Sequence, residues 1–340
     1  MAKRLTLGRM LWICTMLAAV LLGVVVLALQ LGAVPFSLGE LFQNLAWLAS
    51  GHPEKLSTDF RLIMVDIRLP RILLGIIVGA ALSVAGASFQ ALLRNPLADP
   101  YVLGVSSGAA LGAILALLAL PALPLMTPLA AFLGAVATIT AVYFLGRREG
   151  QLDSGTLLLA GIISASFLSA VIMFLMMTLA SRDVRGIAFW LMGDLSAALP
   201  PGLLWILVVG FIIAAGAIFT TASDLNLLLA GEREAMHLGV DVTRVKLVVY
   251  VSASILTGLA VSVGGAIGYV GLLVPHVMRM LFGSDYRVLI PTSALGGAIA
   301  IVLADTLART VVAPTELPVG AMTAMAGAPV FIYLLRRRLS

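Results

Sequence analysis

The sequence predicts an all-α, polytopic membrane protein with about ten transmembrane helices. Of its 340 residues, 61% are hydrophobic and only 11% are charged, whereas soluble domains carry about 25% charged residues. Uncharged runs of about 20 residues, the length that crosses a bilayer as a helix, recur along the whole chain. The net charge of +5 and the single cysteine, Cys14, exclude a nucleic-acid-binding protein and an internal disulfide scaffold.

The uncharged blocks define the spans in chain order. The block 100–146 would be about 70 Å long as one helix at 1.5 Å per residue, so it must fold back at the three prolines between 121 and 128. The block 247–278 would be about 48 Å long and contains three glycines between 264 and 268 where a helix can break. Two crossings in each of these blocks give ten in total. The eight blocks are 10–39, 72–93, 100–146, 154–181, 195–223, 247–278, 288–304 and 317–335.

The basic residues orient these spans. The first block follows three basic residues but has no small-residue cleavage site, so we expect a retained span and not a signal peptide. With the N-terminus inside, fourteen basic residues fall on the cytoplasmic side and seven outside, as the positive-inside rule requires. Both termini are therefore expected in the cytoplasm. We treat 1–340 as a single transmembrane domain with an outer loop at about 40–66 and an inner loop at about 223–246.

Small residues recur every four positions in two of the spans. Such stripes allow helix backbones to approach closely in lipid, although glycine is also tolerated at scattered positions in membrane helices. We expect close packing along Gly75, Gly79, Ser83 and Ala87, and along Gly104, Gly108 and Gly112.

No catalytic or ATP-binding motif is found. The three lysines, Lys3, Lys55 and Lys246, do not follow a glycine, so the chain has no Walker A phosphate loop and any ATPase must be a separate subunit. The three histidines are too scattered for a zinc-helix motif, and no nucleophile elbow occurs. We expect no enzymatic activity, no metal site and no cofactor in this chain.

Ionisable residues are also scarce inside the spans. Ion-coupled carriers usually bury such a residue near mid-membrane, but all sixteen carboxylates lie at or near span ends or in loops. Asp305 and Glu316 come closest to being intramembrane, near the outer surface. This pattern argues against an ion-coupled secondary transporter but leaves that alternative open, because backbone carbonyls can also bind sodium.

Seven segments together resemble one family. In order and spacing they are similar to the FecCD-type permeases, the membrane subunits of type II ABC importers for haem, ferric siderophores and cobalamin. The resemblance extends from about residue 60 to 335. The segments are Arg68–Arg71, Gly86–Gln90, Arg94–Pro100, Leu103–Ala109, Gly268–His276, Ala304–Arg309 and Glu316–Gly320.

The resemblance implies an assembly in the cell (inner) membrane. It implies ten helices per protomer, and a homodimer or close heterodimer around a central pathway. It further implies two cytoplasmic ABC ATPase subunits, which bind ATP and magnesium, and an external substrate-binding protein. The sequence does not distinguish haem, a siderophore or cobalamin as the substrate; family prevalence alone favours haem or an iron chelate.

The inner loop resembles the coupling helices that these permeases insert into a groove of the ATPase. It is polar and amphipathic, and Gly239 can end a helix sharply. The alternative is an ordinary solvated loop. The residues assigned to ATPase coupling are Gly231, Glu232, Glu234, Ala235, Leu238 and Gly239.

Three outer arginines resemble those that receive acidic side chains of the binding protein. Arg68 and Arg71 precede a span and Arg309 follows one, so we expect exposed cations on the side that the positive-inside rule depletes. Arginine suits docking because its guanidinium grips a carboxylate with two hydrogen bonds. The alternatives are interfacial snorkelling or, for Arg309, an internal pair with Asp305 at i,i+4.

Two segments at cytoplasmic span ends resemble the inner gate of the family. They contain Asn95 and Leu97 in one turn, and Ser154 and Thr156 at the start of a span. For Asn95 the alternative is a simple turn signal. At the outer side the segment 185–200 is too short to cross, and we expect an interfacial or re-entrant helix there, anchored by Trp190.

Overall fold

The computed structural model describes residues 6–32, 34, 36–52, 55–120, 123, 125–148, 151–178, 181–197, 200 and 202–339. The described chain is all-helical apart from one two-stranded ladder in which Arg147 pairs with Leu152 and Arg148 with Gln151. Its first half comprises α1 (Leu7–Gln30), α2 (Leu38–Ala49), α3 (Thr58–Phe60), η2 (Arg61–Arg68), α4 (Leu69–Leu92), η3 (Pro100–Leu103), α5 (Val105–Ala119), α6 (Met126–Leu145), β1 (Arg147–Arg148) and β2 (Gln151–Leu152). Its second half comprises α7 (Ser154–Thr178), α8 (Ser181–Leu191), α9 (Leu203–Thr220), α10 (Ala222–Leu228), α11 (Glu232–His237), α12 (Val242–Gly264), α13 (Val270–Phe282), α14 (Tyr286–Thr310) and α15 (Val319–Leu339).

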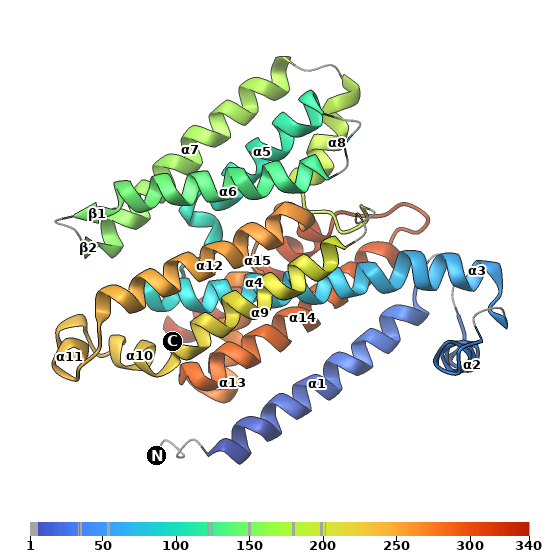
Figure 1. The fold of residues 1–340 in the computed structure, drawn as a ribbon, viewed down its shortest axis with the longest axis horizontal. Coiled ribbons are helices and arrows are strands. Elements are labelled where there is room, and N and C mark those ends of the chain that lie inside the picture. Colours follow the sequence, from blue (N-terminus) through green and yellow to red (C-terminus); the bar gives the residue numbers. More distant parts are fainter. Residues whose placement is uncertain are drawn as a thin grey trace.

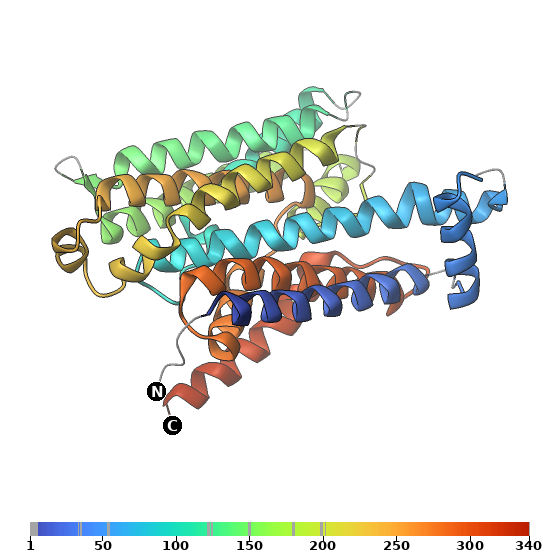
Figure 2. The same ribbon diagram turned by 60° about the horizontal axis from the view of Figure 1, so that its bottom comes forward.

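The long helices run side by side along the longest axis of the molecule (Figure 1). Among the described residues, seven helical segments are long and apolar enough to cross a membrane, and α5, α13 and the first part of α15 are shorter apolar helices. Together they make the ten expected crossings. Figure 2 shows the start of α1 and the end of α15 at the end of the bundle that also carries α10 and α11, as an even number of crossings requires.

Helix α4 lies at the centre of the bundle, where it packs against α12, α13 and α14. The glycine stripe explains how these helices come so close. A methyl group on Gly79 would collide with the carbonyl of Gly297 on α14, and one on Gly86 would collide with the carbonyl of Gly271 on α13. In the same way Gly108 of α5 faces Gly134 of α6. Both predicted stripes therefore form helix contacts, as small residues do in lipid.

Both predicted breaks in the long blocks are confirmed. Helix α5 ends at Ala119 and α6 begins at Met126; Pro128 lies in the first turn of α6, whereas Pro121 and Pro124 lie outside the described residues. Helix α12 ends at Gly264, and Gly265 has the positive φ of +66° that redirects the chain.

The chain between α12 and α13 turns back into the bundle. The backbone N–H of Ile267 donates to the hydroxyl of Tyr101 in η3 at 2.6 Å, and the carbonyl of Gly264 accepts from the N–H of Asp194 at 2.9 Å. Helix α13 has 13 residues, about 20 Å at 1.5 Å per residue, which is shorter than the hydrocarbon core of about 30 Å.

Three boundaries differ from the sequence-based expectation. The outer segment 40–66 is largely helical: η2 leads directly into α4, giving an uninterrupted helical run from Thr58 to Leu92. The inner loop ends earlier than expected, because α12 already begins at Val242, with Asp241 as its N-cap. Helix α8 forms in the outer segment but ends at Leu191. There Trp190 is half-buried and packs against core side chains of the protein.

Candidate functional site

The three outer arginines converge at the ends of α1, α4 and α14. Arg71 donates from Nε to Asp305 Oδ1 at 2.8 Å and from Nη1 to Glu316 Oε2 at 2.7 Å. Arg309, one turn after Asp305 on α14, donates from Nε to its Oδ2 at 3.0 Å. The internal pair at i,i+4, one of the alternatives for Arg309, is therefore present.

Arg68 uses its guanidinium differently. It donates to the carbonyl of Leu29 at 2.6 Å and also to the carbonyl of Val34, just beyond the end of α1. Its guanidinium carbon lies 5.3 Å from the centre of the Phe36 ring, a cation–π distance. Within the described residues no carboxylate forms an ion pair with it.

The expectation that these arginines are exposed is wrong. Arg68 is 4% exposed, and Arg71 and Arg309 are each 7% exposed. The physical reason is that each guanidinium has partners within the chain that compensate its removal from water. The docking role itself stays a prediction.

A hollow of about 190 Å³ opens beside this cluster. Its walls include all three arginines and also Glu316, whose side chain is 47% exposed. Three guanidinium groups against the two carboxylates of Asp305 and Glu316 give the cluster a net charge of +1. The hollow thus offers a positively charged space large enough for a small side chain.

The inner coupling segment consists of α10 and α11 with a glycine at each end of α11. Gly231 has φ +142° and Gly239 has φ +88°, conformations that favour glycine. Ala235 is fully buried and fixes α11 against the bundle, whereas Met236 and Leu238 are 53% and 65% exposed. Apolar side chains at the aqueous end of a membrane protein indicate a surface that a partner covers.

The six predicted coupling residues do not share one orientation. Glu234 and Leu238 are exposed, but the carboxylate of Glu232 faces the bundle. Its Oε1 lies 3.2 Å from Nη2 of Arg94, directly after α4, and 2.7 Å from Nζ of Lys246 on α12.

Helix α10 is fixed to the bundle by Asn226. Its amide donates to Asp285 Oδ1 at 2.9 Å and its carbonyl oxygen accepts from the N–H of Tyr286 at 2.9 Å. Asp285 is the N-cap of α14 and pairs with Arg287. The hydrogen bond from Arg287 is the main cause that lowers the pKa of Asp285 to about 2.

The four predicted gate residues lie at this same inner end. The Asn95 side chain accepts from the N–H of Leu97 at 2.9 Å, so it stabilises its own turn, as the simpler alternative proposed. The hydroxyl of Ser154 donates to the carbonyl of Leu92 at 3.1 Å and joins the start of α7 to the end of α4. Thr156 donates to Asp153 Oδ1 at 2.6 Å. The structure thus brings both gate segments together, far from the arginine cluster.

Sequence reasoning missed several residues of this inner region: Arg94, Lys246, Asn226 and Asp285. Asp285 carried a signal, since an aspartate before an apolar helical run is typical of an N-cap. Arg94 opens one of the family segments, but nothing in the sequence indicated its contact with Glu232, 138 positions away. Lys246 and Asn226 carried no signal for their contacts with Leu152 and Asp285, which lie 94 and 59 positions away.

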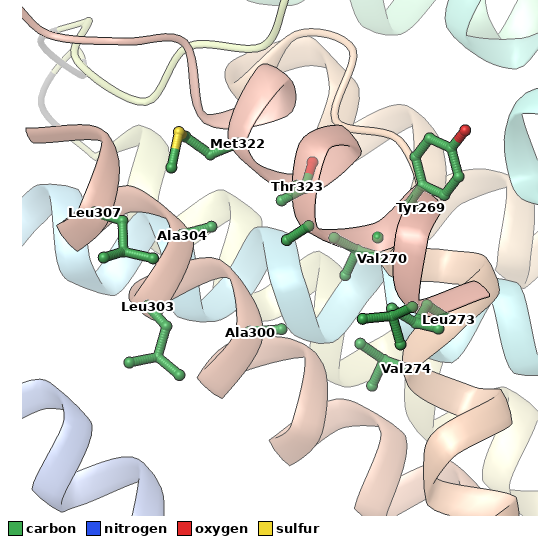
Figure 3. Close-up of a pocket in the computed structure, with 13 residues that line it drawn as sticks. Tyr269, Val270, Leu273, Val274, Ala300, Leu303, Ala304, Leu307, Met322 and Thr323 are labelled. Carbon is green, nitrogen blue, oxygen red and sulfur yellow. The ribbon is translucent and has the colours of Figure 1, made fainter. Parts of the chain in front are cut away.

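An apolar pocket of about 230 Å³ lies between α13, α14 and α15 (Figure 3). Tyr269, Leu303 and Met322 are among its lining side chains. Thr323 contributes a hydroxyl, which already donates to the carbonyl of Gly320 at 2.9 Å. The pocket is therefore suited to apolar side chains or lipid tails. Within the described residues no group of acidic, histidine or cysteine side chains could hold a metal ion.

Comparison with known proteins decides the family. The profile of the FecCD transport family matches residues 19–337. The chain belongs to the FecCD transport family. The predicted resemblance is confirmed, and this FecCD protein is a multi-pass membrane permease of an ABC importer, a transport protein and not an enzyme. Family membership sets aside the ion-coupled carrier.

Individual relatives match over nearly the whole chain. The hemin transport system permease protein HmuU of Yersinia pestis is 40% identical over 335 residues, covering 95% of this chain and 96% of its own. The cobalamin import system permease protein BtuC of Halobacterium salinarum is 45% identical over 286 residues, covering 82% and 74%. A solved chain described as an inward-facing conformation of a metal-chelate type ABC transporter aligns with a TM-score of 0.81 and 30% identity, over 96% and 99%. As a permease of this kind, the FecCD protein works with an ATPase and a binding protein.

Proposed function

We propose that this permease forms the translocation pathway for a bulky metal chelate: haem, a ferric siderophore or cobalamin. The observation that carries the proposal is the match over nearly full length to permeases named for hemin and for cobalamin. The scarcity of charge in the spans supports it, because such a path does not need an intramembrane ion site. Free substrate binds weakly, since the binding protein captures it.

The arginine hollow is the proposed dock for the binding protein. An incoming carboxylate would neutralise the net charge of +1 in the cluster. It would accept hydrogen bonds from Arg68, whose present partners are carbonyl oxygens. A second acidic side chain could replace the exposed Glu316 on Arg71. Burial makes each such pair stronger than one on an open surface.

The α10–α11 segment is the proposed contact with the ATPases. Its exposed apolar residues Leu229, Met236 and Leu238 would fill a groove on the partner. We propose two ATPase subunits, which bind ATP and magnesium, because two permease protomers, most simply identical, each present one segment. We propose that the protomers meet along the apolar side of α15, where Met325 is 72% exposed. Asn95, Leu97, Ser154 and Thr156 would narrow the path at its inner end.

Reconstituted uptake tests this function. The permease, its ATPase and its binding protein are placed in liposomes, and uptake of haemin, a ferric siderophore and cobalamin is measured with and without ATP. ATP-dependent uptake of one of them is expected, and no uptake when the ATPase is omitted. Uptake driven by a proton or sodium gradient without the ATPase would refute the proposal.

A further inference from the structure

Glu232 makes contacts that its assignment to the ATPase interface does not explain. Its carboxylate is turned toward the bundle, where Oε1 meets Nη2 of Arg94 at 3.2 Å and Nζ of Lys246 at 2.7 Å. The Lys246 side chain is only 8% exposed. A buried ammonium group needs a compensating charge, so the position of Glu232 is tightly specified.

Arg94 and Lys246 connect Glu232 to the two gate segments. Arg94 directly precedes Asn95 and its backbone has a left-handed φ of +47°, unusual for a residue with a side chain. Lys246 also donates to the carbonyl of Leu152 at 3.0 Å, two residues before Ser154. The Ser154 hydroxyl in turn donates to Leu92, two residues before Arg94. The contacts form a closed ring around the inner ends of α4, α7 and α12.

The backbone alone is a poor connection between α11 and these helices. Helix α11 has six residues and is flanked by Gly231 and Gly239, both in conformations with positive φ. A displacement of α11 by a partner would be absorbed at these flexible points. The side chain of Glu232 bypasses them, because it joins α11 directly to the residues that hold the gate.

We infer that Glu232 is a positioning residue that clamps the coupling helix to both inner gate segments, through Arg94 to Asn95–Leu97 and through Lys246 to Ser154–Thr156. This inference rests on the proposed function, in which the ATPase moves α11. The clamp then converts that movement into a displacement of the gate. Such coupling requires that α11 take two discrete arrangements, one with and one without nucleotide on the ATPase.

A cysteine reporter at the gate tests the clamp. In a Cys14→Ser background, which removes the single native cysteine, Leu97→Cys places a thiol at a position that is 44% exposed. The complex with ATPase and binding protein is reconstituted, and the rate of maleimide labelling is measured without nucleotide and with ATP plus vanadate. In the parent we expect the two rates to differ by about fivefold or more, the lower end of typical coupling.

Arg94→Ala removes one link of the clamp, and we expect the nucleotide-dependent difference to disappear while the ATPase still copurifies and hydrolyses ATP. The matched control is Arg244→Ala, which removes an exposed inner arginine of α12 outside this ring of contacts and should keep the full difference. Arg94→Lys keeps a cation opposite Glu232 and is expected to keep part of the difference that Arg94→Ala loses. Arg94→Met keeps a long side chain without the charge and is expected to lose the difference.

The outcomes separate the two proposals. If the parent shows no nucleotide-dependent difference, the gate assignment fails and the clamp with it. If the parent shows the difference and Arg94→Ala keeps it in full, the gate stands and the clamp is refuted. If Arg94→Ala does not assemble, Arg94→Met decides, and a full nucleotide-dependent difference in that variant refutes the clamp.

Discussion

At the residue scale, Asp305 is the centre of the outer cluster. One carboxylate, 2% exposed, pairs with Arg71 and Arg309 through separate oxygens. Only the pair with Arg309 could be predicted from sequence, because it follows from helical spacing. The burial of the arginines could not be predicted, because their partners are distant in the sequence. Glu316 lies 245 positions from Arg71, and Leu29 lies 39 positions from Arg68.

Replacement of Asp305 should destabilise the permease. Asp305→Asn leaves two buried guanidinium groups without their shared charge, and we expect a loss of about 3–5 kcal/mol in the free energy of unfolding. Glu316→Gln is the control, because that carboxylate is half exposed and should cost about 1 kcal/mol or less. Thermal unfolding in detergent measures both; equal shifts would contradict the central role of Asp305.

Docking depends on Arg68 in the proposed function. Arg68→Ala should weaken binding-protein affinity about tenfold or more, equivalent to about 1.4 kcal/mol, because a buried guanidinium is lost from the hollow. Arg61→Ala removes an exposed arginine of the same helix η2 and should leave the affinity within about twofold. Titration of the purified binding protein onto permease in nanodiscs gives both constants. Unchanged affinity of Arg68→Ala, with normal assembly, would remove the dock from this hollow.

At the element scale, the sequence predicts two kinds of feature. The spans follow from the absence of charge, and the helix breaks follow from proline or glycine inside long apolar blocks. The helical run from Thr58 to Leu92 was underestimated because η2 carries Arg61, Asp66 and Arg68. In a hydropathy pattern, a segment with these charges looks like a loop. The helix continues nevertheless, because Arg68 has hydrogen-bond partners on α1. Local composition does not contain that information.

The close approach of α4 and α14 should be intolerant of added volume. A Cβ at Gly79 meets the backbone of Gly297, which cannot rotate away, so Gly79→Ala is expected to cost about 1–3 kcal/mol. Gly216 on α9 has open space at its Cβ position, and Gly216→Ala should be neutral or stabilising by up to about 1 kcal/mol. The melting temperatures of both variants in detergent test this expectation. An unchanged melting temperature for Gly79→Ala would contradict it, because α4 and α14 could then move apart without loss of stability.

At the scale of the whole molecule, the described chain leaves α15 with little cover. It packs on α13 and α14, and Met325 and Ile332 are 72% and 58% exposed. Helix α9 lies in front of α4 and α15 behind it (Figure 1). A second protomer covering the side of α15 would leave α9 facing lipid.

Cross-linking distinguishes these two sides. In a Cys14→Ser background, Met325→Cys should give covalent dimers with a short bismaleimide in membranes. Ile213→Cys on α9, 67% exposed, is the control and should stay monomeric. The reverse pattern would place the dimer contact on the α9 side and refute the proposed arrangement.

The turn between α12 and α13 has a consequence for biogenesis. Helix α13 is too short to insert as an independent span, and the polar backbone before it needs partners at membrane depth. The Tyr101 hydroxyl supplies one of these partners and accepts from Ile267. Tyr101 belongs to a segment that leaves the ribosome more than 160 residues earlier. Residues 265–282 can therefore enter the membrane only against helices already in place, which makes the fourth quarter of the chain dependent on the second during synthesis.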